Sequence, residues 1–475
     1  MTRRILIDPV TRIEGHAKIT IRLDDAGEVE EARLHVSDVR GFEKLCEGRS
    51  FREMPALTSR ICGICPVSHA LAASLAGDAI LAVDVPEPAR LVRRLVALAQ
   101  LVQSHALSFF HLSGPDLFLG FDADPARRNL LGLAEAHPDL ARGGIRLRRF
   151  GQEIVEAVAG RRVHGDWTVP GGVLRPLAAE ARDRIREAIP EALRIASAGL
   201  AAWKESAAGR GGEPGMIEGF PGLFLGTVGE DGAPEYVEGR LRLVDERGRI
   251  VADGLEKARW REWIGEAIEP DSYMKAPFFK PLGYPAGAYR VGPLARLNVA
   301  TRCGTPLADA ELSLFRALGH GAVLSSFHAH HARLVEILYA LEAMTLLLQE
   351  PLVLSSEVRA VAARNRSRGV GALEAPRGTL FHDYEVDEGG LLTRVELLVA
   401  TGQNGPAMNQ AITQIARHYL SGGRLREGLL NRVEAGIRAF DPCLSCSTHA
   451  AGKMPLLVEI RAPDGALLDR VERTP

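Results

Sequence analysis

RICGIC (residues 60–65) and DPCLSC (residues 441–446) decide how this chain of 475 residues can fold. Each segment contains a C-x-x-C pair and is followed by a histidine: Cys62, Cys65 and His69 for the first, and Cys443, Cys446 and His449 for the second. Four thiolates suit one soft metal centre, such as zinc, nickel or iron. Because a site built from both pairs closes only after the two ends of the chain meet, we expect the metal to complete the fold.

Two simpler kinds of site also use four cysteines, a structural zinc tetrathiolate and an iron–sulfur cluster. Structural zinc sites usually take both pairs from nearby sequence, with about 15–20 residues between the pairs. Here almost the whole chain separates them. This spacing favours a deep functional site where N- and C-terminal elements meet, although it argues only weakly against an iron–sulfur cluster.

The composition is that of an ordinary globular protein, with 46% hydrophobic and 25% charged residues and a net charge of -2. We therefore expect no nucleic-acid partner. The N-terminus has no apolar signal-peptide core, and no apolar run reaches about 18 residues, so we expect no membrane span. Clustered cysteines favour metal thiolates in a reducing compartment, and the cytoplasm is the simplest location.

Alternating apolar and polar residues predict a β-hairpin in residues 4–45, and helical periodicity dominates from Arg52 onward. The predicted helices cover roughly residues 53–83, 87–112, 126–160, 174–207, 306–319, 322–348, 407–420 and 425–438. Further β-structure is expected in an insertion at about 210–255, in a pair at about 379–400 and in a hairpin made by Leu456–Arg461 and Ala466–Val471, and Pro277–Leu294 is typical of a packed irregular loop. The fold class is therefore α+β and predominantly helical, a long helical bundle with peripheral β-hairpins.

Five segments together resemble the large subunit of nickel–iron hydrogenases. They are the two cysteine segments with their histidines, Arg12–His16 (RIEGH), Arg40–Glu43 (RGFE) and Glu374–Gly378 (EAPRG), in the order of the family. The resemblance spans residues 12–449, almost the entire chain. Within the family, Ser272–Pro277 (SYMKAP) and Tyr289–Leu294 (YRVGPL) look most like the cytoplasmic NAD-reducing, bidirectional branch.

The resemblance implies a nickel–iron centre. Cys62, Cys65, Cys443 and Cys446 would ligate nickel, and Cys65 and Cys446 would also bridge to an iron that carries carbon monoxide and cyanide. Thiolates keep nickel electron-rich, and the diatomic ligands hold the iron low-spin. Such a centre cleaves hydrogen heterolytically.

The resemblance also implies roles around the metals. Glu14 would accept the proton from a nickel thiolate. Arg377 would extend over the open metal position, where it could polarise hydrogen, act as a base or hydrogen-bond a cyanide. Pro376 and Thr401 would complete the pocket for the diatomic ligands, and Asp441 would pair with Arg377.

A second, harder ion is implied near the C-terminus. Glu43, the carbonyl of Leu397 and the imidazole of His449 match the family's magnesium or iron site. Oxygen ligands suit magnesium, whereas a histidine ligand is less usual for it, so the identity of the ion stays open. His69 would hydrogen-bond a bridging sulfur.

Taken singly, several residues have simpler explanations. Glu14 could be a solvated charge, and Arg60 and Asp441 could be helix-end charges. We expect the remaining candidates to be packing residues: His105 and His111 in the core or at an interface, His328, His330 and His331 in a surface or packing role, and Cys46 and Cys303 as buried thiols. Ser104 takes the place of an acidic residue in some relatives, and no role is assigned to it.

The resemblance gives the last residues a separate meaning. In this family an endopeptidase removes the segment after the last histidine, here by a cut between His449 and Ala450 that releases residues 450–475. We therefore expect one catalytic domain, residues 1–449, with a small β-rich insertion, and maturation by this endopeptidase and by nickel chaperones. The alternative is that the hairpin is a permanent structural element.

The sequence has no G-x-G-x-x-G motif after a strand and no P-loop. Electrons must therefore leave through partners, by resemblance flavin-containing diaphorase subunits and an iron–sulfur small subunit, with hydrogen as substrate. The most apolar predicted helix, Leu334–Leu348, offers a candidate face for a partner.

Three alternatives to an NAD-reducing hydrogenase remain. They are a neighbouring branch that reduces NADP or a deazaflavin, a homologous respiratory-complex subunit without the metal, and a zinc-stabilised structural protein. Metal content separates the classes: we expect nickel with iron for a hydrogenase of either branch, no metal for the respiratory-complex subunit and zinc alone for the structural protein.

Overall fold

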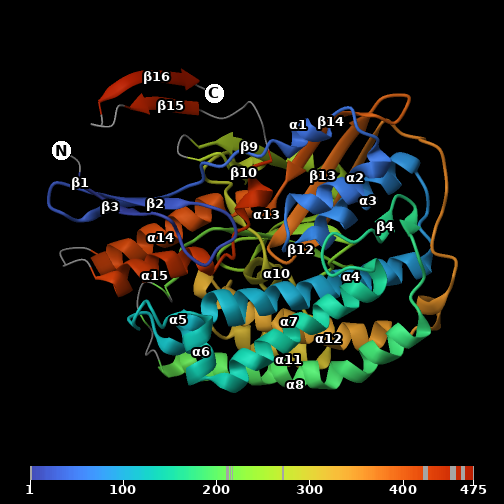
Figure 1. Cartoon of the computed structure of the whole chain (residues 1–475), viewed down its shortest axis with the longest axis horizontal. Coiled ribbons are helices and arrows are strands. Elements are labelled where there is room, and N and C mark those ends of the chain that lie inside the picture. Colours follow the sequence, from blue (N-terminus) through green and yellow to red (C-terminus); the bar gives the residue numbers. More distant parts are fainter. Residues whose placement is uncertain are drawn as a thin grey trace.

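Four long helices lie side by side in one half of the molecule and form a bundle (Figure 1). They bury residues at three- and four-residue spacing, as Leu147, Phe150 and Ile154 show. The helices are α4 (Glu87–Ala106), α7 (Pro138–Ala159), α8 (Ala179–Gly209) and α12 (Ala329–Leu347). The computed structural model describes residues 3–209, 213, 216, 218–269, 272–420, 426–449, 456–461 and 466–473. The predicted helix-rich α+β fold is confirmed.

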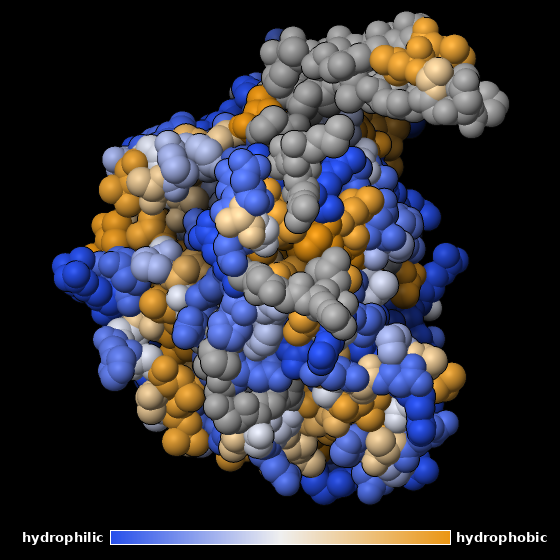
Figure 2. Space-filling model, turned by 90° about the vertical axis from the view of Figure 1, so that its left-hand side faces the viewer, coloured by the Kyte–Doolittle hydropathy of each residue, from blue (hydrophilic) through white to orange (hydrophobic). Residues whose placement is uncertain are grey.

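Helix α12 is apolar on nearly all sides because the chain itself surrounds it. It packs against α4, α8, α10 (Pro293–Val299) and α11 (Pro306–Arg316). Most side chains of Leu334–Leu348 fill the core of this chain, although Leu346 is 58% exposed, so only a narrow edge of the predicted partner face remains at the surface. Exposed apolar side chains are scattered in small groups between polar ones, as on the face in Figure 2.

One helical stretch of the described residues, Glu87–Leu119, is long and apolar enough to cross a membrane by length and composition alone. It joins α4, a π-helical segment (Leu107–Ser113) and α5 (Gly114–Leu119). Its apolar window is 78% buried inside the molecule, as in the core helix of a globular protein.

Three predicted helices are shorter than their periodicity suggested. The stretch 53–83 is divided by the first cysteine segment into α2 (Met54–Thr58) and α3 (Pro66–Leu81). The stretch 126–160 is divided before Pro138 into α6 (Leu130–Ala136) and α7, because a residue before proline avoids the helical region. The stretch 322–348 becomes helical only from a 3-10 turn at Ser326–His328.

The N-terminal β-structure has three antiparallel strands, one more than the predicted hairpin: β1 (Arg3–Ile7), β2 (Lys18–Leu23) and β3 (Val29–His35). Helix α14 (Gly405–Leu420) covers β3, and α15 (Glu427–Arg438) packs against α14. Thr413 and Asn409 of α14 accept hydrogen bonds from the main-chain amides of Ala32 and Leu34. The free edge of β3 is thus satisfied by helix side chains.

The predicted insertion at 210–255 contributes three strands of a four-stranded sheet. Its strands are β6 (Leu223–Val228), β7 (Arg240–Val244) and β8 (Ile250–Leu255), and β11 (Tyr289–Arg290) pairs with β6. The region Pro277–Leu294 is therefore less irregular than predicted.

The predicted pair at 379–400 belongs to a three-stranded antiparallel sheet in the interior. It consists of β12 (Arg368–Ala375), β13 (Gly378–Val386) and β14 (Leu392–Leu398). β12 packs closely on α3, and β13 is buried almost throughout. The sequence prediction omitted β12 and assigned hairpins to the periphery, whereas this sheet lies beside the cysteines.

The remaining elements are short. Cys65 directly precedes α3, and Cys443 directly precedes α16 (Leu444–Ser447). The others are α1 (Phe42–Cys46), α9 (Trp260–Trp263), α13 (Ala400–Gln403), β4 (Thr168–Val169), β5 (Gly172–Val173), β9 (Ile264–Ile268) and β10 (Lys275–Phe279), and 3-10 turns at Phe51–Glu53, Ser59–Ile61, Lys257–Arg259, Lys280–Leu282 and Pro351–Leu354. The predicted C-terminal hairpin is present as β15 (Leu456–Arg461) and β16 (Leu467–Arg473), and its turn lies outside the described residues.

Cys46, Cys303, His105, His330 and His331 pack in the core, whereas His111 and His328 are partly exposed. His105 is fully buried and contacts Glu336. His330 lies edge-on to Phe109 and Phe327, which agrees with a packing role. Burial raises the pKa of Cys46 to about 11 and that of Cys303 to about 12, so both are inert thiols.

The two ends of the chain meet through main-chain hydrogen bonds. Glu14 forms a parallel β-bridge with Cys443, and its carbonyl accepts the amide of Leu444 at 3.1 Å. Its carboxylate accepts the amide of Ser445 at 3.0 Å. Gly15 has φ +88, and an added Cβ would lie 2.7 Å from the Cβ of Leu444. Glycine therefore allows the RIEGH segment to touch the second cysteine segment.

Gly15→Ala should separate the RIEGH segment from the second cysteine segment. Gly27→Ala is its matched control, because Gly27 has nearly the same φ, +86, and an added Cβ would meet nothing within 4 Å. We expect Gly27→Ala to cost about 1 kcal/mol of backbone strain, and Gly15→Ala to lower the melting temperature further and reduce the metal bound by the cysteines. Differential scanning fluorimetry and elemental analysis measure both. Equal melting temperatures and metal contents for the two variants would contradict the importance of this contact.

Candidate metal centre

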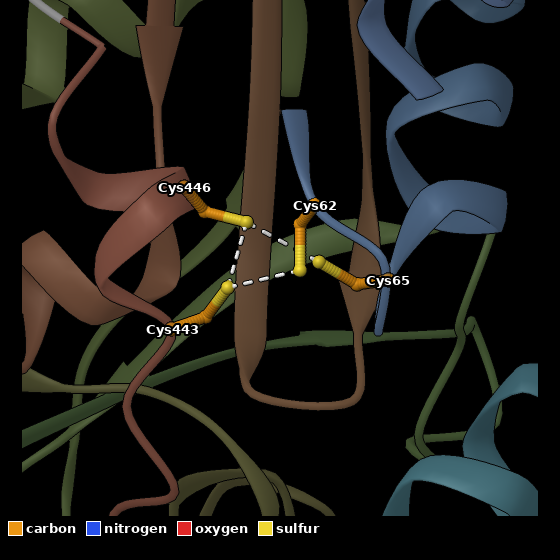
Figure 3. Close-up of side chains that lie close together, drawn as sticks. All are labelled: Cys62, Cys65, Cys443 and Cys446. Carbon is orange, nitrogen blue, oxygen red and sulfur yellow. Dashed lines mark hydrogen bonds between the residues drawn. The ribbon is translucent and has the colours of Figure 1, made fainter. Parts of the chain in front are cut away.

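The four predicted cysteines converge in one buried cluster (Figure 3). Cys62 and Cys65 lie in the loop before α3, and Cys443 and Cys446 lie at the start of α16. The sulfur of Cys443 is 3.2 Å from that of Cys62 and 2.9 Å from that of Cys446, and Cys65 and Cys446 are 3.3 Å apart. All four sulfurs lie within 4.8 Å of one another, and each residue is at most 6% exposed. The spacing is that of one shared metal site.

The second cysteine segment is held on both sides by N-terminal residues. Beyond the contacts of Glu14, the amides of Arg40 and Gly41 donate to the carbonyl of Thr448. The guanidinium of Arg40 donates to the carbonyl of Ile61 at 2.5 Å. The RGFE segment therefore connects the two cysteine loops directly.

Arg377 lies at the tip of the hairpin between β12 and β13. Ala375 pairs with Gly378, so Pro376 and Arg377 are the two residues of the turn. The Arg377 guanidinium donates to the carbonyl of Asp441 at 2.5 Å and to its carboxylate at 3.1 Å. The predicted pairing of Arg377 with Asp441 is thus present as an ion pair, and both residues are buried.

Charge holds Arg377 in its protonated form. Burial alone would lower the pKa of the guanidinium, but the carboxylate of Asp441 and the sulfurs of Cys443, Cys65 and Cys62 together raise it above its ordinary value. Conversely, burial raises the pKa of Asp441, and Arg377 opposes that effect. The cation is therefore fixed beside the cysteine cluster.

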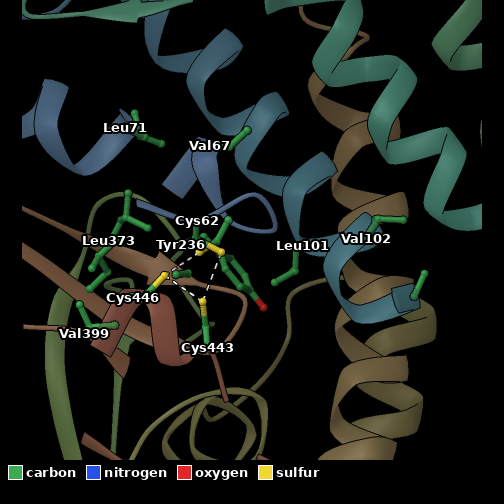
Figure 4. Close-up of a cluster of buried hydrophobic side chains, with 14 of the residues drawn as sticks. Cys62, Val67, Leu71, Leu101, Val102, Tyr236, Leu373, Val399, Cys443 and Cys446 are labelled. Atoms are coloured by element: carbon green, nitrogen blue, oxygen red, sulfur yellow. Dashed lines mark hydrogen bonds between the residues drawn. The ribbon is translucent and has the colours of Figure 1, made fainter. Parts of the chain in front are cut away.

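A small cavity adjoins the sulfurs and is mostly apolar. Ala375, Leu380, Val399 and Ala400 line it together with Pro376, Arg377, Thr401 and three of the cysteines. Figure 4 shows the apolar side chains around the cluster, Leu373 and Val399 on one side and Val67, Leu71 and Leu101 on another. The hydroxyl of Thr401 accepts the amide of Cys443 at 2.9 Å. Its own proton remains available for a ligand in the cavity.

These residues fit a nickel–iron centre. The soft sulfur donors suit nickel and iron. The apolar wall can surround small diatomic ligands, and Arg377 and Thr401 can donate hydrogen bonds to them. Burial raises the pKa values of the Cys443 and Cys446 thiols, whereas hydrogen bonds from neighbouring sulfurs lower the pKa of Cys65. The sulfurs therefore share protons, and a metal that binds to them would replace these protons.

His69 begins a buried hydrogen-bonded chain that the sequence analysis missed. Its Nε2 lies 3.3 Å from the sulfur of Cys446, as predicted for a hydrogen bond to a bridging cysteine. Its Nδ1 contacts Nε2 of His382 at 3.0 Å, and Nδ1 of His382 contacts the hydroxyl of Tyr384 at 2.5 Å. His382 and Tyr384 alternate along β13, so strand periodicity in FHDYE was the available signal. The chain fixes the orientation of the His69 ring.

The residues of the predicted hard-metal site also come together. Nδ1 of His449 lies 2.9 Å from the carboxylate of Glu43, which accepts the amide of Leu397 at 2.8 Å. In an antiparallel strand the amide and the carbonyl of one residue point to the same edge, so the Leu397 carbonyl also faces Glu43. Burial would raise the pKa of Glu43, but His449, Lys275 and the Leu397 amide lower it to about 2. The Glu43 carboxylate is therefore charged at neutral pH and could serve as an oxygen ligand.

Ser104 lies near the cluster, with its hydroxyl 3.5 Å from the guanidinium of Arg377. Ala450, on the far side of the predicted cut, lies outside the described residues. The other predicted site residues form two groups. One lies in or beside the cysteine cluster: Glu14, Cys62, Cys65, His69, Pro376, Arg377, Thr401, Asp441, Cys443 and Cys446. Glu43, Leu397 and His449 come together at the predicted hard-metal site.

Residues 40–128 and 242–449 match a family model described as nickel-dependent hydrogenase, and residues 4–39 match one described as HoxL-like. Over its full length the chain is 41% identical to the NAD-reducing hydrogenase HoxS subunit beta of Cupriavidus necator, which is also covered completely. It is 38% identical to a protein of the F420-non-reducing hydrogenase vhc of Methanococcus voltae, with 98% of this chain and 99% of that protein covered.

Solved structures agree. An NAD+-reducing [NiFe]-hydrogenase in the H2-reduced state superposes with a TM-score of 0.92 at 44% identity, covering 94% of this chain and 100% of that one. A Ni-Fe-Se hydrogenase from Desulfovibrio vulgaris Hildenborough gives a TM-score of 0.76 at 26% identity with the same coverage. The four-cysteine cluster thus lies in a fold and a sequence that match these enzymes from end to end, and the chain belongs to the nickel–iron hydrogenase large-subunit family.

Proposed function

We propose that this chain is the catalytic subunit of an NAD-reducing hydrogenase, which cleaves H2 reversibly and heterolytically and passes the electrons through partner subunits to NAD+. The observation that carries the proposal is the cluster of four buried thiolates, drawn from both ends of the chain and facing a cavity with one fixed cation. When bound, the nickel–iron centre supplies the electrophile that polarises H2 and accepts its electrons. We further propose that its iron carries carbon monoxide and cyanide and that Cys65 and Cys446 would help to hold this iron.

Arg377 contributes a fixed positive charge beside the sulfurs. A buried guanidinium in a low-dielectric cavity acts strongly on charge that develops nearby. Its pairing with Asp441 limits its motion, and its planar group can hydrogen-bond a cyanide. Pro376 presents no amide to the cavity, and Thr401 offers a hydroxyl proton.

Glu14 is the proposed proton acceptor. Its main chain pairs with Cys443, and its half-buried carboxylate is held by the amide of Ser445. It therefore lies between the cysteine cluster and the surface, where a carboxylate can take a proton from a thiol and release it outward.

Electron transfer requires partners. The sequence has no nucleotide-binding motif, and the two cysteines outside the cluster, Cys46 and Cys303, are too few for an iron–sulfur cluster. Flavin-containing diaphorase subunits and an iron–sulfur small subunit, all in the cytoplasm, fit the 41% identity with an NAD-reducing enzyme. Reduction of NADP or a deazaflavin is the alternative to be tested, and the 38% match, to an enzyme named F420-non-reducing, does not favour a deazaflavin as the acceptor.

Removal of residues 450–475 is part of the proposal. The family match ends at His449, and the solved relative is covered completely although this chain is covered only to 94%. The main-chain contacts of Thr448 and His449 with residues 40–43 already exist in the uncut chain. Cutting after His449 by a maturation endopeptidase, after nickel delivery by chaperones, would leave these contacts at the new C-terminus.

Infrared spectroscopy of the anaerobically purified complex tests the proposal first. We expect one band from metal-bound carbon monoxide and two from cyanide, together with H2-dependent reduction of NAD+. NADP or deazaflavin reduction with the same bands would change only the acceptor. A fully processed protein that shows no such bands and contains zinc or no metal is not a hydrogenase.

Glu14→Gln tests the proton acceptor. Glutamine keeps an oxygen for the Ser445 amide but cannot take up a proton. We expect H2 turnover to fall by about 10²–10⁴-fold, while the carbon monoxide and cyanide bands stay in place. Turnover within a few-fold of the parent enzyme would assign the proton to another group.

Glu43→Gln tests the second ion, which we propose to be magnesium or iron held by Glu43, the Leu397 carbonyl and His449. Loss of a group that only orients a metal ligand already costs about 10–100-fold in metal affinity. Loss of the anionic Glu43 carboxylate, a direct ligand in this proposal, should therefore remove the second ion and leave nickel bound. Glu47→Gln is the control, because Glu47 pairs only with Lys44 at the surface among the described residues. Elemental analysis that finds the ion retained by Glu43→Gln would exclude this site.

A further inference from the structure

The YRVGPL segment continues into Arg296, a residue that no step above uses. Arg296 is fully buried on α10, and all five of its N–H donors are occupied. Nε and Nη2 bind the two carboxylate oxygens of Glu336 at 2.6 and 2.7 Å. Nη1 binds the carboxylate of Glu374 at 3.0 Å and the carbonyl of Ala375 at 2.9 Å, and Nη2 binds the carbonyl of Pro376 at 3.0 Å. The Arg296 side chain thus binds the hairpin turn that contains Arg377.

The turn needs such a partner. Its carbonyls are buried with the rest of the hairpin tip, and a buried carbonyl without a donor costs about 1–3 kcal/mol. The backbone also closely approaches the segment that leads into α10, since a Cβ at Gly378, which has φ +136, would lie 2.4 Å from a methyl of Val291. The main chain at Pro376 and Arg377 is therefore placed against the YRVGPL segment.

The carboxylates that hold Arg296 are themselves fixed. Glu336 also receives hydrogen bonds from the hydroxyl of Tyr236 at 3.1 Å and from His105 at 2.7 Å. Glu374 receives the amide and hydroxyl of Thr227 and the hydroxyl of Thr379. Both carboxylates are buried, so the network has little freedom to shift.

We infer that Arg296 is a positioning residue for the metal site: it fixes the turn at Ala375 and Pro376 from behind, and so sets where the Arg377 guanidinium meets the metal ligands. Asp441 binds the guanidinium of Arg377, and Arg296 binds the main-chain carbonyls of the two residues that precede Arg377. Lysine at position 296 would keep the charge but could not bridge two carboxylates and two carbonyls in one plane. This inference rests on the proposed function, because it concerns the cation beside the nickel–iron centre.

Arg296→Lys in the complete complex tests the inference. We expect the cyanide bands to shift or split, because they report nearby donors, and H2 turnover to fall by about 10–100-fold, since a misplacement of 1 Å can cost as much. The nickel content should remain that of the parent enzyme.

Arg93→Lys is the matched control. Arg93 is also buried, binds the carboxylate of Asp78 at 2.6 Å and donates to the carbonyls of Val169 and Gly172. Asp78 lies near the opposite end of α3 from Cys65, about 20 Å away at 1.5 Å per residue. The Arg93→Lys enzyme should therefore keep the infrared bands and the turnover of the parent.

Two results would overturn the inference. In the first, Arg296→Lys keeps both the infrared bands and the turnover of the parent enzyme. In the second, Arg296→Lys and Arg93→Lys lose turnover equally while the infrared spectra of both variants stay unchanged. If Arg296→Lys does not accumulate, Tyr236→Phe loosens Glu336 without removing a charge and should shift the same bands, and an unchanged spectrum again overturns it. If the parent enzyme has no such bands, the proposed function itself fails before any variant is compared.

Discussion

The meeting of the two chain ends is the constraint on which the rest of this structure depends. Closing a loop of nearly 400 residues costs roughly 5 kcal/mol of chain entropy by the logarithmic law. The contacts between Glu14 and the segment Cys443–Ser445, and those of Arg40 with Thr448, offset part of that cost. Binding to four thiolates contributes more, about 10–16 kcal/mol in small zinc domains. Metal binding and chain closure are thus coupled, and a junction as tight as the one at Gly15 matters to both.

Burial of charge is the second constraint. A buried ion stays stable only when it is paired and fully hydrogen-bonded. Arg296 meets both conditions through Glu336, Glu374 and two carbonyls, and Arg377 is paired with Asp441. Arg377 belongs to the hairpin turn whose carbonyls Arg296 binds, so two paired charges hold this turn in place. A site whose cation is held in this way needs little reorganisation when charge changes at the metals.

The sequence alone was sufficient for the cysteines, for Arg377 with Asp441 and for Glu43 with His449, because short segments with strict spacing carry them. The periodicity also found most helices, although it ran through the breaks at Cys62–Cys65 and Pro138. It could not place β12 in the interior or assign Arg296, whose partners lie far away in the chain. The alternation in FHDYE did not by itself join His382 and Tyr384 to His69, which lies 313 residues before His382. Nor could the periodicity show that α12 is surrounded by its own chain, because apolarity alone does not distinguish a core from an interface.

The structure also disfavours one of the three roles that the family resemblance leaves to Arg377, that of a base. A base must lose its proton, but Asp441 and the cysteine sulfurs raise the pKa of this guanidinium, and deprotonation would leave a buried carboxylate unpaired. Arg377 is therefore suited to polarise H2 or to donate hydrogen bonds, and the proton must go elsewhere. Glu14 is half-buried on an N-terminal segment and joined to Cys443 through the main chain. The proposed division of roles follows from burial: the fixed arginine would supply charge, and the carboxylate nearer the surface would carry the proton.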